Sequence, residues 1–142
     1  MTSSAIAYLD TEFDAPTDTL LSLALVLDDA SECYLVLADQ AEDPWVRENV
    51  LPRLGRAPIG RILAQQHLRH FMRPYDSLHI VADWPQDLAY LCELFITGPG
   101  EAMPTPRLTF EWARNLDTAA SAVPHNALAD AHALREMDQG SC

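Results

Sequence analysis

Apolar residues are gathered into short runs in the N-terminal part of the chain. Residues 5–9, 20–27 and 33–37 are apolar runs of strand length, and the acidic stretch 28–31 separates the last two. Because a short polar stretch between two apolar runs is typical of a turn, we expect three strands that form an antiparallel meander.

The pattern then changes to the period of an α-helix. Between residues 44 and 72 apolar side chains recur at helical spacing, and Gly55 with Pro58 divides this region into one short and one longer helix. Residues 78–82 follow as a buried strand. A proline at the start of residues 85–95 suits the first turn of another helix.

The C-terminal part contains one ambiguous element and one clear element. Residues 98–106 are rich in glycine and proline and predict a loop, whereas residues 107–117 fit either a strand or a helix. Residues 126–137 have the pattern of a final helix. This order of elements favours an α/β fold with helices covering a mixed sheet, and the length fits one domain over residues 1–142.

The net charge of the chain limits the kinds of molecule that it is expected to bind. The formal net charge is −12, and all 9 basic side chains counted as Lys or Arg are arginines. Such acidity opposes tight binding to duplex DNA, because that affinity comes mainly from neutralised phosphates. A carboxylate cluster that binds divalent cations would reverse the charge locally, and acidity that only keeps the protein soluble is the alternative.

The N-terminal segment and the cysteines bear on the compartment. Residues 1–13 have no basic region, and two acidic residues interrupt their apolar stretch, so we expect neither a signal peptide nor a membrane span. Cys33, Cys92 and Cys142 have no metal-ligand spacing, which favours reduced thiols. We therefore expect a cytoplasmic protein without a zinc ribbon or a disulfide framework.

Carboxylates and one histidine occur where predicted strands and helices meet. Asp10 and Glu12 lie at the end of the first predicted strand, and alternation puts both on one face, where they can point at one metal ion. Asp87 lies in the first turn of the helix after the fourth strand, where stabilising the helix dipole is the alternative role. His125 and Asp130 begin the last helix. Each short motif often arises by chance, so the argument depends on their order and setting together.

In this order, the motifs resemble those of the four-carboxylate-plus-histidine (DEDDh) class of 3′ to 5′ exonucleases, which includes ribonuclease T, oligoribonuclease and proofreading exonucleases. The residues that carry the resemblance are Asp10-Thr11-Glu12, Asp87 within WPQDLAYL, and His125 with Asp130. The segment WVRENVLPRL is similar to a subgroup of small bacterial exoribonuclease-like proteins, and the resemblance covers nearly the whole chain.

One position departs from the pattern of the class. The second motif normally has Asn four residues before its Asp, and this chain has Asp83 there. Asp87 is our choice for the carboxylate of the second motif, and Asp83 is the alternative. The resemblance implies an RNase H-like fold with a five-stranded mixed sheet, flanked by helices, whose first three strands are antiparallel.

The resemblance also implies a reaction and its cofactors. It predicts hydrolysis of phosphodiester bonds at the 3′ end of single-stranded nucleic acid, RNA favoured, with release of nucleoside monophosphates. Two Mg²⁺ ions, or Mn²⁺ in their place, would be held with Asp10 as the bridge. Glu12, Asp87 and Asp130 would complete the shells, and His125 would take the proton of the attacking water.

Other residues are candidates for substrate contact. Phe13 and Thr11 flank Glu12 and are the candidates for binding a terminal nucleotide, although a packing role for Phe13 is equally compatible with the sequence. Residues 50–75 carry arginines and histidines but no acidic residue, which suits either a path for the phosphate backbone or a solvated helix face. Three tryptophans are expected to be core or interface anchors, with lining of a nucleotide site as the alternative: Trp45, Trp84 and Trp112. His79 lies in a buried strand pattern and is expected to be structural, whereas His132 is expected to bind no metal.

Alternatives remain open on the residues alone. A proofreading or repair exonuclease would act on DNA with the same carboxylates, and only contacts to the 2′-hydroxyl would distinguish RNA. A non-catalytic RNase H-like module would bind a partner protein, and a related fold would act on di- and trinucleotides or other small substrates. The resemblance further implies a homodimer.

Overall fold

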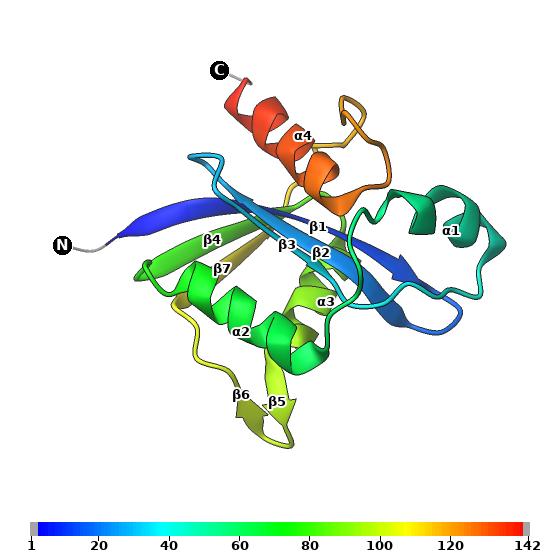
Figure 1. Ribbon diagram of the computed structural model, residues 1–142. Coiled ribbons are helices and arrows are strands. Elements are labelled where there is room, and N and C mark those ends of the chain that lie inside the picture. The colour runs from blue at the N-terminus through cyan, green and yellow to red at the C-terminus, as the bar shows by residue number, and fades with distance from the viewer. Residues whose placement is uncertain (1–2, 141–142) are drawn as a thin grey trace.

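The computed structural model describes residues 3–140, in which helices pack on both faces of a central sheet (Figure 1). Cys142, one of the cysteines expected to be reduced, lies outside the described residues, and Cys33 and Cys92 are free thiols. None of the helices in this part of the chain combines the length and the apolar character that crossing a bilayer requires.

The sheet has five strands in the order β3-β2-β1-β4-β7 within residues 3–140. β1 (Ser4–Asp14), β2 (Thr19–Leu27) and β3 (Glu32–Val36) form an antiparallel meander. β4 (Ser77–Ala82) runs parallel to β1, and β7 (Arg107–Trp112) runs parallel to β4. This arrangement confirms the predicted α/β fold, with the mixed sheet and antiparallel first strands of an RNase H-like layout.

Two layers of helices cover the sheet. α2 (Arg61–Met72) and α3 (Pro85–Leu94) pack on one face, and α1 (Pro44–Asn49) and α4 (Ala127–Gln139) pack on the other. A short 3₁₀ turn, η1 (Leu51–Arg53), follows α1. Because both faces are covered, the interior strand β2 is apolar on both faces except for Thr19 and Ser22, and does not alternate.

Alternation along β2 assigns its side chains to the two layers. Leu23 and Leu25 belong to the core cluster that contains Leu68 of α2, whereas Ala24 and Val26 belong to the cluster beneath α4. The α4 layer continues onto β1 and β4 through the separate cluster of Tyr8, Val81 and Leu134. Burial of these side chains supplies most of the driving force for folding.

Three details differ from the predicted elements. β1 continues to Asp14 and does not end near Leu9, so the acidic pair lies within the strand. Residues 98–106, predicted as a loop, contain part of a two-stranded hairpin formed by β5 (Ile96–Gly98) and β6 (Glu101–Ala102). The ambiguous residues 107–117 begin as the strand β7, and the chain leaves the sheet after Trp112.

The sheet opens where β1 and β4 separate. Their parallel pairing runs from Ser4 opposite Ser77 to Tyr8 opposite Val81, whereas the pairing of β1 with β2 continues to Asp14. The segments just beyond the β1–β4 pairing therefore diverge, and the first turns of α3 and α4 approach them from opposite faces (Figure 1). Ligand sites of α/β proteins commonly lie at such strand ends.

Candidate metal centre

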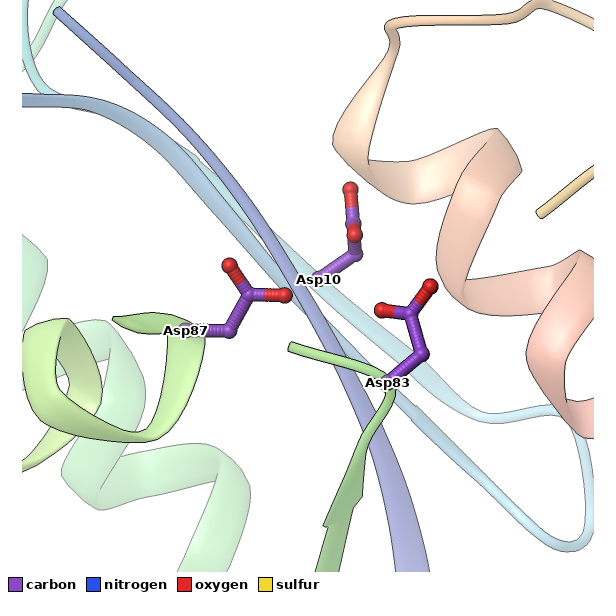
Figure 2. A group of neighbouring side chains, drawn as sticks. All are labelled: Asp10, Asp83 and Asp87. Carbon is purple, nitrogen blue, oxygen red and sulfur yellow. The ribbon is translucent and has the colours of Figure 1, made fainter. Parts of the chain in front are cut away.

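Two groups of three carboxylates meet where β1 and β4 separate, and they share Asp10. One group is Asp10, Asp83 and Asp87, and the other is Asp10, Glu12 and Asp130. Within each group, one oxygen of every carboxylate lies within 4.8 Å of the others. Figure 2 shows the first group, in which the side chains of Asp83 and Asp87 turn toward Asp10 from either side.

Each carboxylate owes its place to a different element. Asp10 and Glu12 are two residues apart on β1, so alternation places both on one face. Asp83 directly follows β4, and Asp87 lies in the first turn of α3. Asp130 lies in the first turn of α4, which Asn126 caps through a 2.9 Å bond from the backbone N–H of Ala129. The two helix N-termini add partial positive charge at the centre.

Thr11 points away from the face that Asp10 and Glu12 share. Its side chain is buried, and its hydroxyl donates a 2.6 Å hydrogen bond to Oδ1 of Asp87. The sequence suggested Thr11 as a substrate contact, but the structure places it where it orients a carboxylate of the centre. It thus links β1 to the first turn of α3.

Burial raises the pKa of every acid in the centre, and repulsion between carboxylates adds to the shift at Asp10, Glu12, Asp83 and Asp87. Burial is the main cause at Asp10, whose pKa lies well above its usual range, with repulsion from Asp87 and Glu12 adding to it. Burial likewise raises the pKa of Glu12 to about 9 and that of Asp87 to about 7, although the bond from Thr11 acts against the shift at Asp87. The pKa values of Asp83 and Asp130 are also raised, mainly by burial.

Two buried oxygens of the centre lack a hydrogen-bond partner among the described residues. They are Oδ2 of Asp10 and Oδ1 of Asp130. A buried carboxylate oxygen without a partner costs free energy, and most such groups in native proteins are satisfied. Hard divalent cations bind carboxylate oxygens, so the composition and the electrostatics of this centre fit cations of the Mg²⁺ type.

His125 lies in the turn that leads into α4, beside the second group of carboxylates. Attraction to the imidazolium form of His125 and the nearby backbone of His125 oppose the upward shift of the Asp130 pKa. The imidazole of His125 contacts the indole of Trp45, with ring centroids 4.8 Å apart and an interplanar angle of 80°. The structure therefore brings His125 together with the acids that the sequence grouped with it.

The aromatic candidates are distributed around the centre. Phe13 stacks at a tilt on Tyr90 of α3, with centroids 4.9 Å apart, so a packing contact is present there. The tryptophans are not core residues, because their exposed fractions are 50% for Trp45, 52% for Trp84 and 43% for Trp112. The indole N–H of Trp112 donates to the carbonyl oxygen of Asp83, so this side chain borders the first group of acids.

Three arginines of the segment 50–75 are engaged within the protein: Arg53, Arg56 and Arg61. Arg61 pairs with Glu93 at 3.0 Å, and Arg56 donates to the carbonyl oxygen of Tyr34. Arg69 and Arg73 lie at the C-terminal end of α2, near the start of β4. The start of β4 pairs with Ser4 of β1, and Asp10 lies six residues further along β1. At about 3.3 Å per residue, that end of the sheet is about 20 Å from Asp10.

His79 and His132 both contact residues on other elements. His79 lies on β4 and contacts Thr109 and Glu111 of the neighbouring strand β7. His132 lies on α4 and contacts Glu32 at 2.7 Å.

Sequence reasoning did not find the contact of Trp45 with His125 or the part played by Asp14. Asp14 is buried at the end of β1, and its carboxylate accepts hydrogen bonds from the backbone N–H groups of Glu42 and Asp43. These bonds lower the pKa of Asp14. No pattern in the sequence identifies Asp14 as a residue that fixes a loop. Its position on the same strand as the acidic pair is the one signal that could have drawn attention to it.

No protein-family model matches the chain, and no match was found among curated proteins. The acidic centre, His125 and the residues around them are the features of the chain that bear on its function.

Proposed function

We propose that this chain is a metal-dependent 3′ to 5′ exonuclease that acts on single-stranded nucleic acid, RNA favoured, and releases nucleoside monophosphates. The observation that supports this most is the presence of two groups of three carboxylates that have Asp10 in common. One shared carboxylate between two sets of oxygen ligands is the arrangement that a pair of divalent cations needs. The motif resemblance described above points to the same chemistry.

The residues of the centre would divide between two Mg²⁺ or Mn²⁺ ions. Asp83 and Asp87 would serve one ion, Glu12 and Asp130 the other, and Asp10 both. When bound, such a pair stabilises the negative charge that develops on the attacking and leaving oxygens of a phosphodiester. Thr11 holds Asp87 in place through its 2.6 Å hydrogen bond, and the helix N-termini favour the negative charge of Asp87 and Asp130.

His125 would act as the general base. His125 lies in the turn that leads into α4, the helix that carries Asp130, and an imidazole is suited to accepting a proton at neutral pH. The proton would pass from the attacking water to a ring nitrogen of His125. The negative charge of Asp130 would then favour the imidazolium that forms.

Charge favours short or single-stranded substrates over long duplexes. A net charge of −12 repels a polyanion, and the cations of the centre would lower that repulsion only where the scissile phosphate lies. We accordingly propose single-stranded RNA or short oligonucleotides as substrates, with DNA as the alternative backbone. A cytoplasmic location and a homodimer are part of the same proposal.

The test is release of mononucleotides from 3′-labelled and 5′-labelled single-stranded RNA and DNA, with Mg²⁺, Mn²⁺ or EDTA. We expect shortening from the 3′ end that EDTA and Asp10→Ala abolish. The matched control is Asp39→Ala, which removes an exposed carboxylate outside the centre and should leave the rate unchanged. Absence of turnover with either metal would refute the proposal and favour a non-catalytic binding module, and faster shortening of DNA would change the substrate.

A further inference from the structure

An exposed tryptophan contacts the histidine proposed as the general base. The indole of Trp45 stands nearly perpendicular to the imidazole of His125, at 80° and with centroids 4.8 Å apart. Edge-to-face contact is a favoured geometry for aromatic rings. Trp45 is 50% exposed and its neighbour Val46 fills the core position of α1, so the indole is not needed to anchor the helix.

The backbone of His125 requires support from its surroundings. Its φ of 69° lies in the left-handed region, which a residue with a Cβ adopts at a cost. The adjacent Asn126 fixes the turn: its side-chain amide donates to the carbonyl oxygen of Arg53 at 2.7 Å, and its Oδ1 caps α4. The segment containing α1 and η1 thus contacts the His125 turn twice, through Arg53 and through Trp45.

That segment is in turn fixed to the strand of the acidic pair. The Asp14 carboxylate at the end of β1 accepts bonds from the backbone N–H groups of Glu42 and Asp43, at 2.9 and 3.0 Å. The side chain of Asp43 then caps α1 by accepting a 2.9 Å bond from the backbone N–H of Trp45. A continuous series of contacts therefore runs from β1 to the indole, and from the indole to His125.

We propose that Trp45 is a positioning residue for His125, holding the imidazole toward the acidic centre through the edge-to-face contact; this role rests on the proposed exonuclease function. A side chain on a turn has rotamer freedom that a neighbouring ring removes. A general base must lie within hydrogen-bond reach of the proton it takes, and small displacements cost rate. Trp45 itself would not touch the reacting atoms.

The test is a double-mutant cycle on steady-state kinetics with a short 3′-labelled RNA. Trp45→Ala should lower kcat on the order of tenfold and leave KM unchanged, because it displaces the base without removing a substrate contact. Trp45→Phe retains an aromatic edge and should restore most of kcat. In a His125→Ala background the same Trp45→Ala change should have no further effect on kcat. Glu48→Ala, an exposed position on the same helix, is the control for α1 itself.

Each contrary result has a definite meaning. A raised KM with unchanged kcat would assign Trp45 to substrate binding, and an equal loss of kcat with and without His125 would show that Trp45 does not act through it. Either result overturns the proposal.

A second measurement needs neither activity nor metal. The ring current of the indole should shift the NMR resonance of the His125 imidazole Cε1–H, which can be assigned by its disappearance in His125→Ala. Trp45→Ala should move this resonance toward the value of a free imidazole, and an unmoved resonance would overturn the proposal. Inactivity of the parent chain would remove the exonuclease proposal and the positioning role with it, whereas an active parent with an unmoved resonance would remove the positioning role alone.

Discussion

The acidic centre should make the metal-free protein less stable than a variant that lacks one of its charges. Glu12 is the best position for this test, because its carboxyl group is largely buried and faces the negative charges of Asp130 and Asp87. Glu12→Gln keeps the size of the side chain and removes the charge. We therefore expect Glu12→Gln to raise the free energy of unfolding in EDTA, although it removes a proposed ligand.

The magnitude follows from the pKa of Glu12, which rises from 4.5 to about 9 on folding. A group whose pKa is raised in the folded state contributes stability that is complete below the unfolded pKa and is lost as pH rises through the folded pKa. For Glu12 that window runs from pH 4.5 to about 9. pH 7 is about 2.5 pH units above the lower limit of this window. At about 1.4 kcal/mol per unit, Glu12 therefore lowers the free energy of unfolding at pH 7 by up to about 3 kcal/mol.

Urea denaturation in EDTA at a series of pH values measures this directly. The free energy of unfolding of the parent should fall between pH 5 and pH 9, and the curve for Glu12→Gln should be flatter and lie higher at pH 7. Saturating Mg²⁺ should stabilise the parent more than the variant. Glu48→Gln, at an exposed position, is the matched control and should follow the parent. A Glu12→Gln protein that is less stable than the parent at pH 7 would contradict the reasoning.

Two further substitutions test the supports of the centre. Thr11→Val removes the hydroxyl that lowers the pKa of Asp87, so the pKa of Asp87 should rise further. Because such a hydrogen bond contributes about 1–2 kcal/mol, the affinity for Mn²⁺, measured by calorimetry at pH 7, should fall about tenfold. Unchanged affinity would exclude the role given to Thr11. Asn126→Ala removes the cap of α4 and the bond to the Arg53 carbonyl, so the free energy of unfolding should fall by about 1–2 kcal/mol; a change below a few tenths of a kcal/mol in urea denaturation would contradict it.

The main strands could be predicted because their buried positions are occupied by apolar residues. β2 is covered on both faces, so its residues from Leu20 to Leu27 are all apolar except Ser22, and polar turns bound them. The β5–β6 hairpin was missed for the converse reason. Its strands of 3 and 2 residues are too short to show a period, and the Gly98-Pro99-Gly100 stretch that signalled a loop supplies its turn. β7 is an edge strand with exposed side chains, so its residues carried little strand pattern.

The acidic centre was predictable in its members but not in all its contacts. Alternation on one strand grouped Asp10 with Glu12, and the same rule places Thr11 on the opposite face, where Asp87 lies. Asp83 and Asp87 were alternatives for one role, yet both lie within reach of Asp10, because the end of β4 and the first turn of α3 are consecutive. The contact of Trp45 with His125 depends on two segments far apart in sequence, and no local pattern announces it.

The position of α4 has a consequence for biosynthesis. Asp130 reaches Glu12 only when this last helix has packed across the first strands, where Tyr8 donates to Asp138 and Arg135 donates to the carbonyl oxygen of Asp28. Such contacts between distant parts of a chain form late and cannot precede translation of the C-terminal helix. The second group of carboxylates is therefore incomplete until α4 has been synthesised and has packed, so a nascent chain would not carry the assembled acidic centre before that point.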